Sequence, residues 1–179
     1  MNLSYYLYNK YSDYQINMSD RINMSDNIYA SGLNDEGQLG IGHTNSVRAF
    51  TEVTGGWGKI VAMECGEEHT FMRSEHGKWY AAGRNNYGQL GLGHKNEVCA
   101  FTEIKDTGDW GKIVEVKCGM HHTFMRSEDG KVYAAGSNAK GRLGLGHTDE
   151  VSTFTEVTGD WGKIVAMVCG GSHTFMRSE

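Results

Sequence analysis

The stretch HTFMRSE occurs three times without a single change, at residues 69–75, 122–128 and 173–179. A longer repeated unit of about 50 residues surrounds each copy, so the chain is an array of similar units. One unit of this kind cannot bury its apolar face alone, and neighbouring units must stack to form a shared core. The repeat therefore indicates a fold built of stacked units.

The second unit shows the expected strands most clearly. Residues 112–119, KIVEVKCG, alternate β-branched and polar side chains and stop at a glycine, which predicts a strand. Residues 122–128 predict a second strand, and the Asp-Gly pair at 129–130 favours a tight hairpin because glycine tolerates a positive φ. Residues 131–136 return as a third strand, and residues 153–157 form a fourth.

Four short antiparallel strands in a unit of about 50 residues are typical of a β-propeller blade. Apolar residues do not recur at helical spacing, which excludes the α-solenoids, and a parallel β-helix would use much shorter coils. The fold class predicted is all-β, with four-stranded antiparallel blades and three repeats in the chain. The repeats fill residues 27–179, with boundaries at about 27–77, 78–130 and 131–179.

Residues 1–26 form a polar, tyrosine-rich arm that carries its own small duplication, INMSD at 16–20 and again at 22–26. The second copy resembles a degenerate FMRSE, and it is followed by residues 28–32, IYASG, which match the third strand of the other units. One interpretation is that the arm supplies a degenerate hairpin that completes the first blade within its own chain. The alternative is a tether that docks on a neighbouring molecule.

Charge and hydropathy exclude several classes of partner. The net charge is −5, from 17 basic and 22 acidic residues, without a basic cluster, whereas binding to nucleic acid requires clustered Lys and Arg. No apolar run approaches the ~20 residues needed to span a bilayer. The N-terminus lacks the charged and apolar regions of a signal peptide. We therefore expect no nucleic acid, no membrane, and a cytoplasmic or other reducing location.

The repeated cysteines and histidines predict structural roles. Cys65, Cys118 and Cys169 are equivalent and lack the CxxC-type spacing of zinc sites, so we expect reduced thiols and no metal. A histidine repeated in every unit, such as His69 or His122, is expected to do the same structural job each time. No catalytic constellation stands apart from the repeats, and the glycine-rich loops match no nucleotide-binding fingerprint. The sequence thus predicts no enzyme, no cofactor and no catalytic residue.

The glycine-rich loops carry a family resemblance. They read GQLGIGH at 37–43, GQLGLGH at 88–94 and GRLGLGH at 141–147, and each is followed later by CG-x-x-HT. Over residues 28–179 the chain resembles the regulator-of-chromosome-condensation repeat family, which implies a β-propeller, usually of seven blades. Seven units would need roughly 360 residues. Members commonly carry a tryptophan before the glycine of the third strand, where this chain has Ser31, Ala82 and Ala135.

A tryptophan precedes the first strand of each unit, at Trp57, Trp110 and Trp161. These side chains are predicted to anchor packing between blades. Some plant photoreceptors of the family use tryptophans directly before HT. Here those positions hold EE, MH and GS, which disfavours ultraviolet sensing.

The two ends of the repeated region predict self-assembly. The region begins with a third and a fourth strand, 28–31 and 50–53, and finishes with a first and a second strand within 163–179. Pairing of these complementary halves between copies would be heterologous, so it would close a ring or grow a filament. Two copies would make six blades, and a seven-blade rotation would instead give a fibre or a strained ring. The interface residues predicted are Ile28, Tyr29, Phe50, Val53, Ile164, Val165, Phe175 and Met176.

These observations predict a non-enzymatic propeller scaffold or structural protein that binds itself and other proteins. The alternative comes from the resemblance, which implies guanine-nucleotide exchange on a small GTPase such as Ran. The partner loop for that activity would lie at the insertion in the second unit, with Lys105, Asp106 and Asp109 as its candidate residues.

Overall fold

The computed structural model describes residues 27–105 and 110–179, and every regular element in them is a β-strand. Within these residues no helix is long and apolar enough to cross a membrane. The all-β prediction is confirmed. The strands are β1 (Ile28–Gly32), β2 (Val47–Val53), β3 (Ile60–Cys65), β4 (His69–Ser74), β5 (Trp79–Gly83), β6 (Val98–Glu103), β7 (Ile113–Cys118), β8 (His122–Ser127), β9 (Val132–Gly136), β10 (Val151–Glu156), β11 (Ile164–Cys169) and β12 (Thr174–Ser178).

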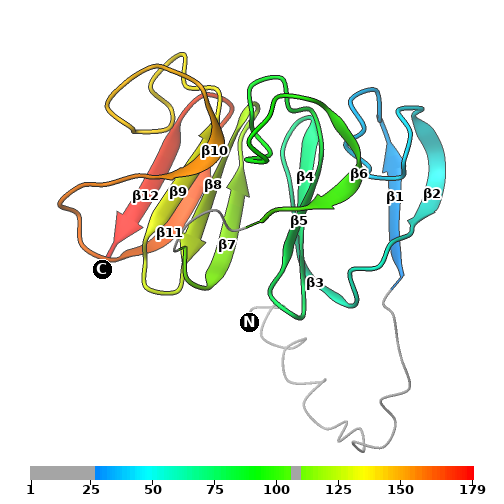
Figure 1. The fold of residues 1–179 in the computed structure, drawn as a ribbon, viewed down its shortest axis with the longest axis horizontal. Coiled ribbons are helices and arrows are strands. Elements are labelled where there is room, and N and C mark those ends of the chain that lie inside the picture. The colour runs from blue at the N-terminus through cyan, green and yellow to red at the C-terminus, as the bar shows by residue number, and fades with distance from the viewer. Residues whose placement is uncertain (1–26, 106–109) are drawn as a thin grey trace, which may run out of the picture.

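The strands form two complete blades between two half-blades. Strands β3-β4-β5-β6 make the first full blade and β7-β8-β9-β10 the second, with every neighbouring pair antiparallel. Strands β1 and β2 form the N-terminal half-blade, and β11 and β12 the C-terminal half-blade. Figure 1 shows the four sheets side by side in an open row, with the two half-blades at opposite ends.

The predicted hairpin at 129–130 is present. Ser127 N donates to Lys131 O over 2.9 Å, and Gly130 N donates to Ser127 O over 3.0 Å. Gly130 has φ +89°, a conformation that costs glycine little because it has no Cβ. The Asp-Gly pair thus reverses the chain between the second and third strands of the second full blade.

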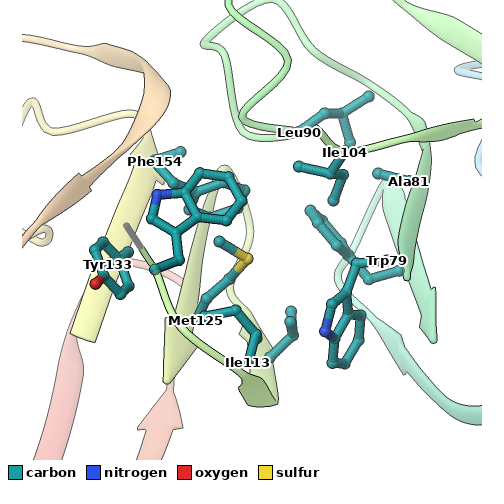
Figure 2. Packing of buried hydrophobic residues seen from close by; sticks show 12 residues of the cluster. Trp79, Ala81, Leu90, Ile104, Ile113, Met125, Tyr133 and Phe154 are labelled. Carbon is teal, nitrogen blue, oxygen red and sulfur yellow. The ribbon is translucent and has the colours of Figure 1, made fainter. Parts of the chain in front are cut away.

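The hydrophobic core lies between neighbouring blades. One cluster joins the two full blades and includes Trp79, Leu90, Trp110, Met125 and Phe154, all of them buried (Figure 2). Two further clusters occupy the junctions nearer the ends of the array. Full burial of one such apolar side chain contributes about 1.5–3 kcal/mol. Because each cluster needs side chains from adjacent sheets, a single blade has no complete core of its own.

Each glycine-rich loop is held by a buried asparagine. Asn85 Nδ2 donates to His94 O at 2.8 Å and to Asn96 O at 3.0 Å, and its Oδ1 accepts from Leu90 N at 3.0 Å. His94 Nδ1 accepts from Asn96 N at 3.2 Å. The loop histidine therefore fixes its own loop, which is a structural job of the kind that the sequence predicts.

Candidate functional site: the open ends of the blade array

Hydrogen bonds through histidine and threonine connect successive blades. His69 Nε2 lies 2.9 Å from Thr123 Oγ1, and the Thr123 hydroxyl donates to Gln89 O over 2.8 Å. Since that hydroxyl hydrogen is already used, the imidazole must be the donor to Thr123. His122 repeats the arrangement with Thr174 at 3.0 Å in the next blade. Each complete connection therefore carries one histidine, one threonine and one loop carbonyl.

These two histidines are neutral. Burial lowers the pKa of His69 to about 3, and the pKa of His122 to about 4, because a charged imidazole loses its hydration there. Both imidazoles lie against a glycine that follows a first strand, Gly66 for His69 and Gly119 for His122. Their chemistry is that of neutral hydrogen-bond donors.

A second contact between blades joins tryptophan, phenylalanine and glycine. Trp110 meets Phe154 edge to face, with ring centroids 5.8 Å apart at an interplanar angle of 83°. Phe154 also lies over Gly91 of the preceding blade, where a Cβ would come within 2.2 Å of the phenylalanine ring. Gly40 and Phe101 repeat the same close approach one blade earlier. Only glycine leaves room for the ring at these loop positions.

The C-terminal end of the array lacks this phenylalanine. Gly144 corresponds to Gly91, yet a Cβ there would meet just one atom within 4 Å, Val157 Cγ1 at 3.6 Å. Trp161 corresponds to Trp110 but is exposed. Together with Phe124 and Met176, these residues line a pocket of about 280 Å³.

The outer strands of the two half-blades expose side chains that the full blades bury. Phe175 of β12 is 70% exposed, whereas Phe71 and Phe124 in the identical sequence of β4 and β8 are 0% and 2% exposed. Tyr29 of β1 is 52% exposed, whereas its counterpart Tyr133 is buried. Within the described residues, β12 pairs with β11 alone and β1 with β2 alone. Each end of the array therefore presents an unpaired strand edge.

The predicted interface residues divide into exposed, half-buried and buried groups. Tyr29, Phe50 and Phe175 are exposed. Ile28 and Val53, which lie opposite each other in the β1-β2 pair, are buried in the core at the N-terminal end. Ile164 is likewise buried, while Val165 and Met176 are half-buried. The exposed members and the pocket lie at the two ends of the array.

The three tryptophans expected between blades occupy three environments. Trp110 is buried in the cluster between the two full blades, and Trp57 is half-buried against the N-terminal cluster and Phe101. Trp161 lines the open pocket. Of the predicted partner loop, Lys105 is exposed, and Asp106 and Asp109 lie outside the described residues.

The cysteines are free thiols in the described residues. Burial raises the pKa of Cys118 well above its ordinary value, and raises that of Cys169 to about 11, so both remain protonated near neutral pH. Across 27–105 and 110–179, no group of three His, Cys, Asp or Glu residues is arranged to hold a metal ion. Protonated thiols are poor metal ligands and nucleophiles.

Ion pairs add a polar connection between blades. Lys117 Nζ of β7 lies 3.2 Å from Glu64 Oε2 of β3, and both side chains are partly buried. Arg84 is bound to Glu68 and lies 3.9 Å from Glu36 Oε1 of the preceding blade. Local sequence patterns indicate neither these pairs nor the His–Thr connections, and of the two only the His-Thr pair recurs in all three repeats, at 69–70, 122–123 and 173–174.

The family model of the regulator of chromosome condensation (RCC1) repeat matches residues 25–72, 76–125 and 129–176. The chain belongs to the RCC1 repeat family. A second RCC1 model matches residues 60–89 and 113–142. The family resemblance seen in the sequence is thereby confirmed.

Two relatives show the range of proteins in which similar RCC1 repeats occur. The chain is 48% identical over 92 residues to the X-linked retinitis pigmentosa GTPase regulator of Canis lupus familiaris, covering 51% of this chain and 9% of the relative. It is 36% identical over 122 residues to the secretion-regulating guanine nucleotide exchange factor of Bos taurus, covering 67% of this chain and 26% of the relative. This RCC1 chain thus spans a minor part of the length of both.

Solved structures confirm the propeller fold. The RCC1 chain superimposes on Prp20p of Saccharomyces cerevisiae with a TM-score of 0.75 at 21% identity, covering 84% of this chain and 39% of that one. Prp20p is described by its binding properties to Gsp1p and histones. A likeness at this identity concerns the fold, and it identifies the four sheets as consecutive blades of a propeller.

Proposed function

We propose that this RCC1 chain is a non-enzymatic scaffold that assembles head to tail, with β12 of one copy paired with β1 of the next. The observation that carries the proposal is the exposure of HTFMRS at the C-terminal end. In the second strand of both full blades all of these residues but the arginine are buried, whereas at the C-terminal end His173, Phe175 and Arg177 are exposed and the other three are half-buried. An exposed strand edge with apolar side chains favours addition of another strand.

The full blades define the register of the added strand. In both of them the second and third strands pair in the same way, with His69 opposite Gly83 and His122 opposite Gly136. The equivalent pairing between copies places His173 opposite Gly32 and Phe175 opposite Ala30. Strands β11 and β12 of one copy then form one four-stranded blade with β1 and β2 of the next.

This contact is heterologous, because the two surfaces that meet are different. A heterologous contact closes as a ring if the rotation per copy divides a full turn, and otherwise it grows as a filament. Each copy contributes two full blades and two halves, so two copies supply six blades. A ring or filament of RCC1 blades would offer repeated loop surfaces to protein partners.

Light scattering of the 179-residue chain over a hundredfold range of concentration tests the proposal. A discrete dimer supports a closed ring, and a mass that grows with concentration supports a filament. A monomer at every concentration contradicts self-assembly. Ser178→Pro in β12 serves as the disrupting variant, because the equivalent Ser74 N and Ser127 N donate to the third strand at Lys78 O and Lys131 O, and proline removes that backbone donor.

A second candidate function is regulation of a small GTPase, which the names of two relatives favour. In the structure the candidate contact begins at the exposed Lys105, which follows β6. The test is release of a fluorescent guanine nucleotide from a Ran-type GTPase. Acceleration that is weakened by Asp106→Ala and Asp109→Ala would favour exchange activity over a purely structural role.

A further inference from the structure

Phe50 on β2 is the most exposed large apolar side chain in the described residues, at 76%. Its counterparts at the same position of the fourth strands are Phe101 and Phe154. Phe101 packs on Trp57, and Phe154 is 5% exposed and packs on Trp110. Phe50 is thus the one of these three phenylalanines that is not packed on a tryptophan in the described residues.

We infer that Phe50 of one copy inserts into the pocket between Trp161, Gly144 and Phe124 at the far end of another copy. This inference rests on the proposed head-to-tail assembly and names the contact that determines its order and register. Phe50 acts as the plug, and those three residues form its socket.

Each wall of the socket has a counterpart around Phe154. Trp110 touches Phe154 edge to face, and Phe71 lies 6.3 Å from it at 72°. Gly91 gives the ring its space in the preceding loop. At the C-terminal end the equivalent residues are Trp161, Phe124 and Gly144, and all three line the pocket. The phenylalanine is the missing member.

The spacing of the blades explains why the plug must come from β2. In the first full blade, Trp57 precedes the first strand and packs on Phe101 of the fourth strand. Trp110 and Phe154 repeat this relationship in the second full blade. Trp161 precedes the first strand of the C-terminal half-blade, which has no fourth strand among residues 27–105 and 110–179. A second copy supplies that strand as β2.

Two polar contacts accompany the plug in the same geometry. Gly42 N donates to Cys99 O, and Gly93 N donates to Ser152 O, both over 2.8 Å. The equivalent bond joins Gly146 N to Arg48 O of the second copy. His173 is exposed, whereas the equivalent histidines His69 and His122 each donate to a threonine in the following blade.

The threonine that would receive His173 is Thr70 of the second copy. Thr70 donates its hydroxyl to Gln38 O over 2.8 Å, as Thr123 donates to Gln89 O. Its oxygen is therefore oriented as an acceptor in the same way. Docking would bury His173 as its counterparts are buried, so the apolar plug and the polar contact define one relative position of the copies.

Two variants test the inference from opposite sides. Phe50→Ala removes the plug, and Gly144→Ala fills the space that the plug needs. The matched controls are Thr51→Ala, on the other face of β2, and Gly111→Ala, between Trp110 and β7 and outside the proposed contact. Gly111 has φ +64° and Gly144 has φ +68°, so both alanine variants carry similar backbone strain, yet a Cβ at Gly111 meets nothing within 4 Å.

Light scattering of each variant gives the first readout. We expect Phe50→Ala and Gly144→Ala each to raise the concentration for half-assembly at least tenfold, and both controls to assemble like the parent chain. Thermal melting checks that every variant is folded. Assembly of Phe50→Ala at the parent concentration would overturn the plug while leaving self-assembly intact. A parent chain that is monomeric throughout would overturn both.

Mixing the two variants gives the decisive readout. Phe50→Ala retains an intact socket, and Gly144→Ala retains an intact plug. In the mixture, Phe50 of the Gly144→Ala chain can therefore bind the socket of the Phe50→Ala chain, while the remaining two ends cannot bind each other. We expect each variant alone to be monomeric and the mixture to form a complex of two chains that grows no further. A mixture that remains monomeric, or that grows into larger species, contradicts a heterologous plug-and-socket contact.

Discussion

His69 Nε2 lies 2.9 Å from Thr123 Oγ1 although the two residues are 54 positions apart. The bond crosses from one blade to the next, and the threonine continues it to a loop carbonyl. A buried polar group of this kind stabilises the fold only while its partner is present. The connection therefore couples the stability of adjacent blades to the protonation of a histidine.

Acid is expected to destabilise the array before the carboxylates titrate. The folded pKa values of His69 and His122, about 3 and about 4, lie below the ordinary value of 6.5, so the unfolded chain binds more protons below pH 6.5. The free energy of unfolding should fall as pH drops from 6.5 towards 4, by about 2 kcal/mol per histidine at pH 5. Burial also lowers the pKa of His121, which acts in the same direction.

Urea unfolding at pH 7, 6 and 5 measures this dependence. The pKa values of Glu128 and Asp129 are also lowered, but these two carboxylates change the free energy of unfolding only below pH 4.5 and 3.8, their ordinary pKa values, and so outside this pH range. His122→Gln should flatten the profile between pH 6.5 and 5, while His76→Gln, at a turn position whose side chain is 71% exposed, should retain it. Equal slopes for both variants would contradict the assignment.

Removal of the threonine hydroxyl should weaken the same connection at neutral pH. Thr123→Val keeps the shape of the side chain but leaves the His69 imidazole and the Gln89 carbonyl without this partner. We expect a loss of about 1–3 kcal/mol in the free energy of unfolding. Thr102→Val is the control, because that exposed hydroxyl bonds only locally, to Ala100 O at 3.2 Å. A loss below about 0.5 kcal/mol for Thr123→Val would mean that the bond contributes little.

Strand positions were predictable from the sequence because alternation and glycine stops are local signals. The strands expected at 112–118, 122–128, 131–136 and 153–157 correspond to β7, β8, β9 and β10. The Asp-Gly hairpin is local in the same sense. Three copies of one pattern also indicated which strands belong to one blade.

Contacts between blades were harder to predict because they join residues about 50 positions apart. The sequence indicated that His69 and Trp110 have structural roles but gave neither partner, since Thr123 and Phe154 become neighbours only when blades stack. The predicted interface included Ile164, which the structure buries in the core of its own chain. Alternation identified an apolar face, and only the packing revealed which neighbour covers it.

Cross-linking tests the strand register between copies. Phe175→Cys combined with Ala30→Cys places two thiols at positions that correspond to Phe124 and Ala134, which lie opposite each other in the second full blade. Directly opposite residues have Cβ atoms about 4.5–5.5 Å apart, within reach of a disulfide after small adjustments. We expect covalent multimers that disappear on reduction.

Two controls accompany the cross-link. The parent chain shows what its four native cysteines form by themselves. Phe175→Cys combined with Tyr29→Cys shifts the second thiol by one residue, to the other face of β1, and should yield far less product. Equal yields from both pairs would contradict the register.

Phe50 and Phe154 occupy the same position of the repeat, yet their truncation should affect the isolated chain differently. Phe154→Ala removes a buried ring from between Trp110 and Gly91 and should cost about 3–5 kcal/mol in the free energy of unfolding. Phe50→Ala removes a ring that is 76% exposed, so below the assembly concentration we expect a change within about 0.5 kcal/mol. Above that concentration the parent chain should gain stability as it assembles, since binding favours the folded state, and Phe50→Ala should not. Denaturant titrations at two protein concentrations separate these cases, and a large loss for Phe50→Ala in the dilute sample would show that Phe50 already packs within its own chain.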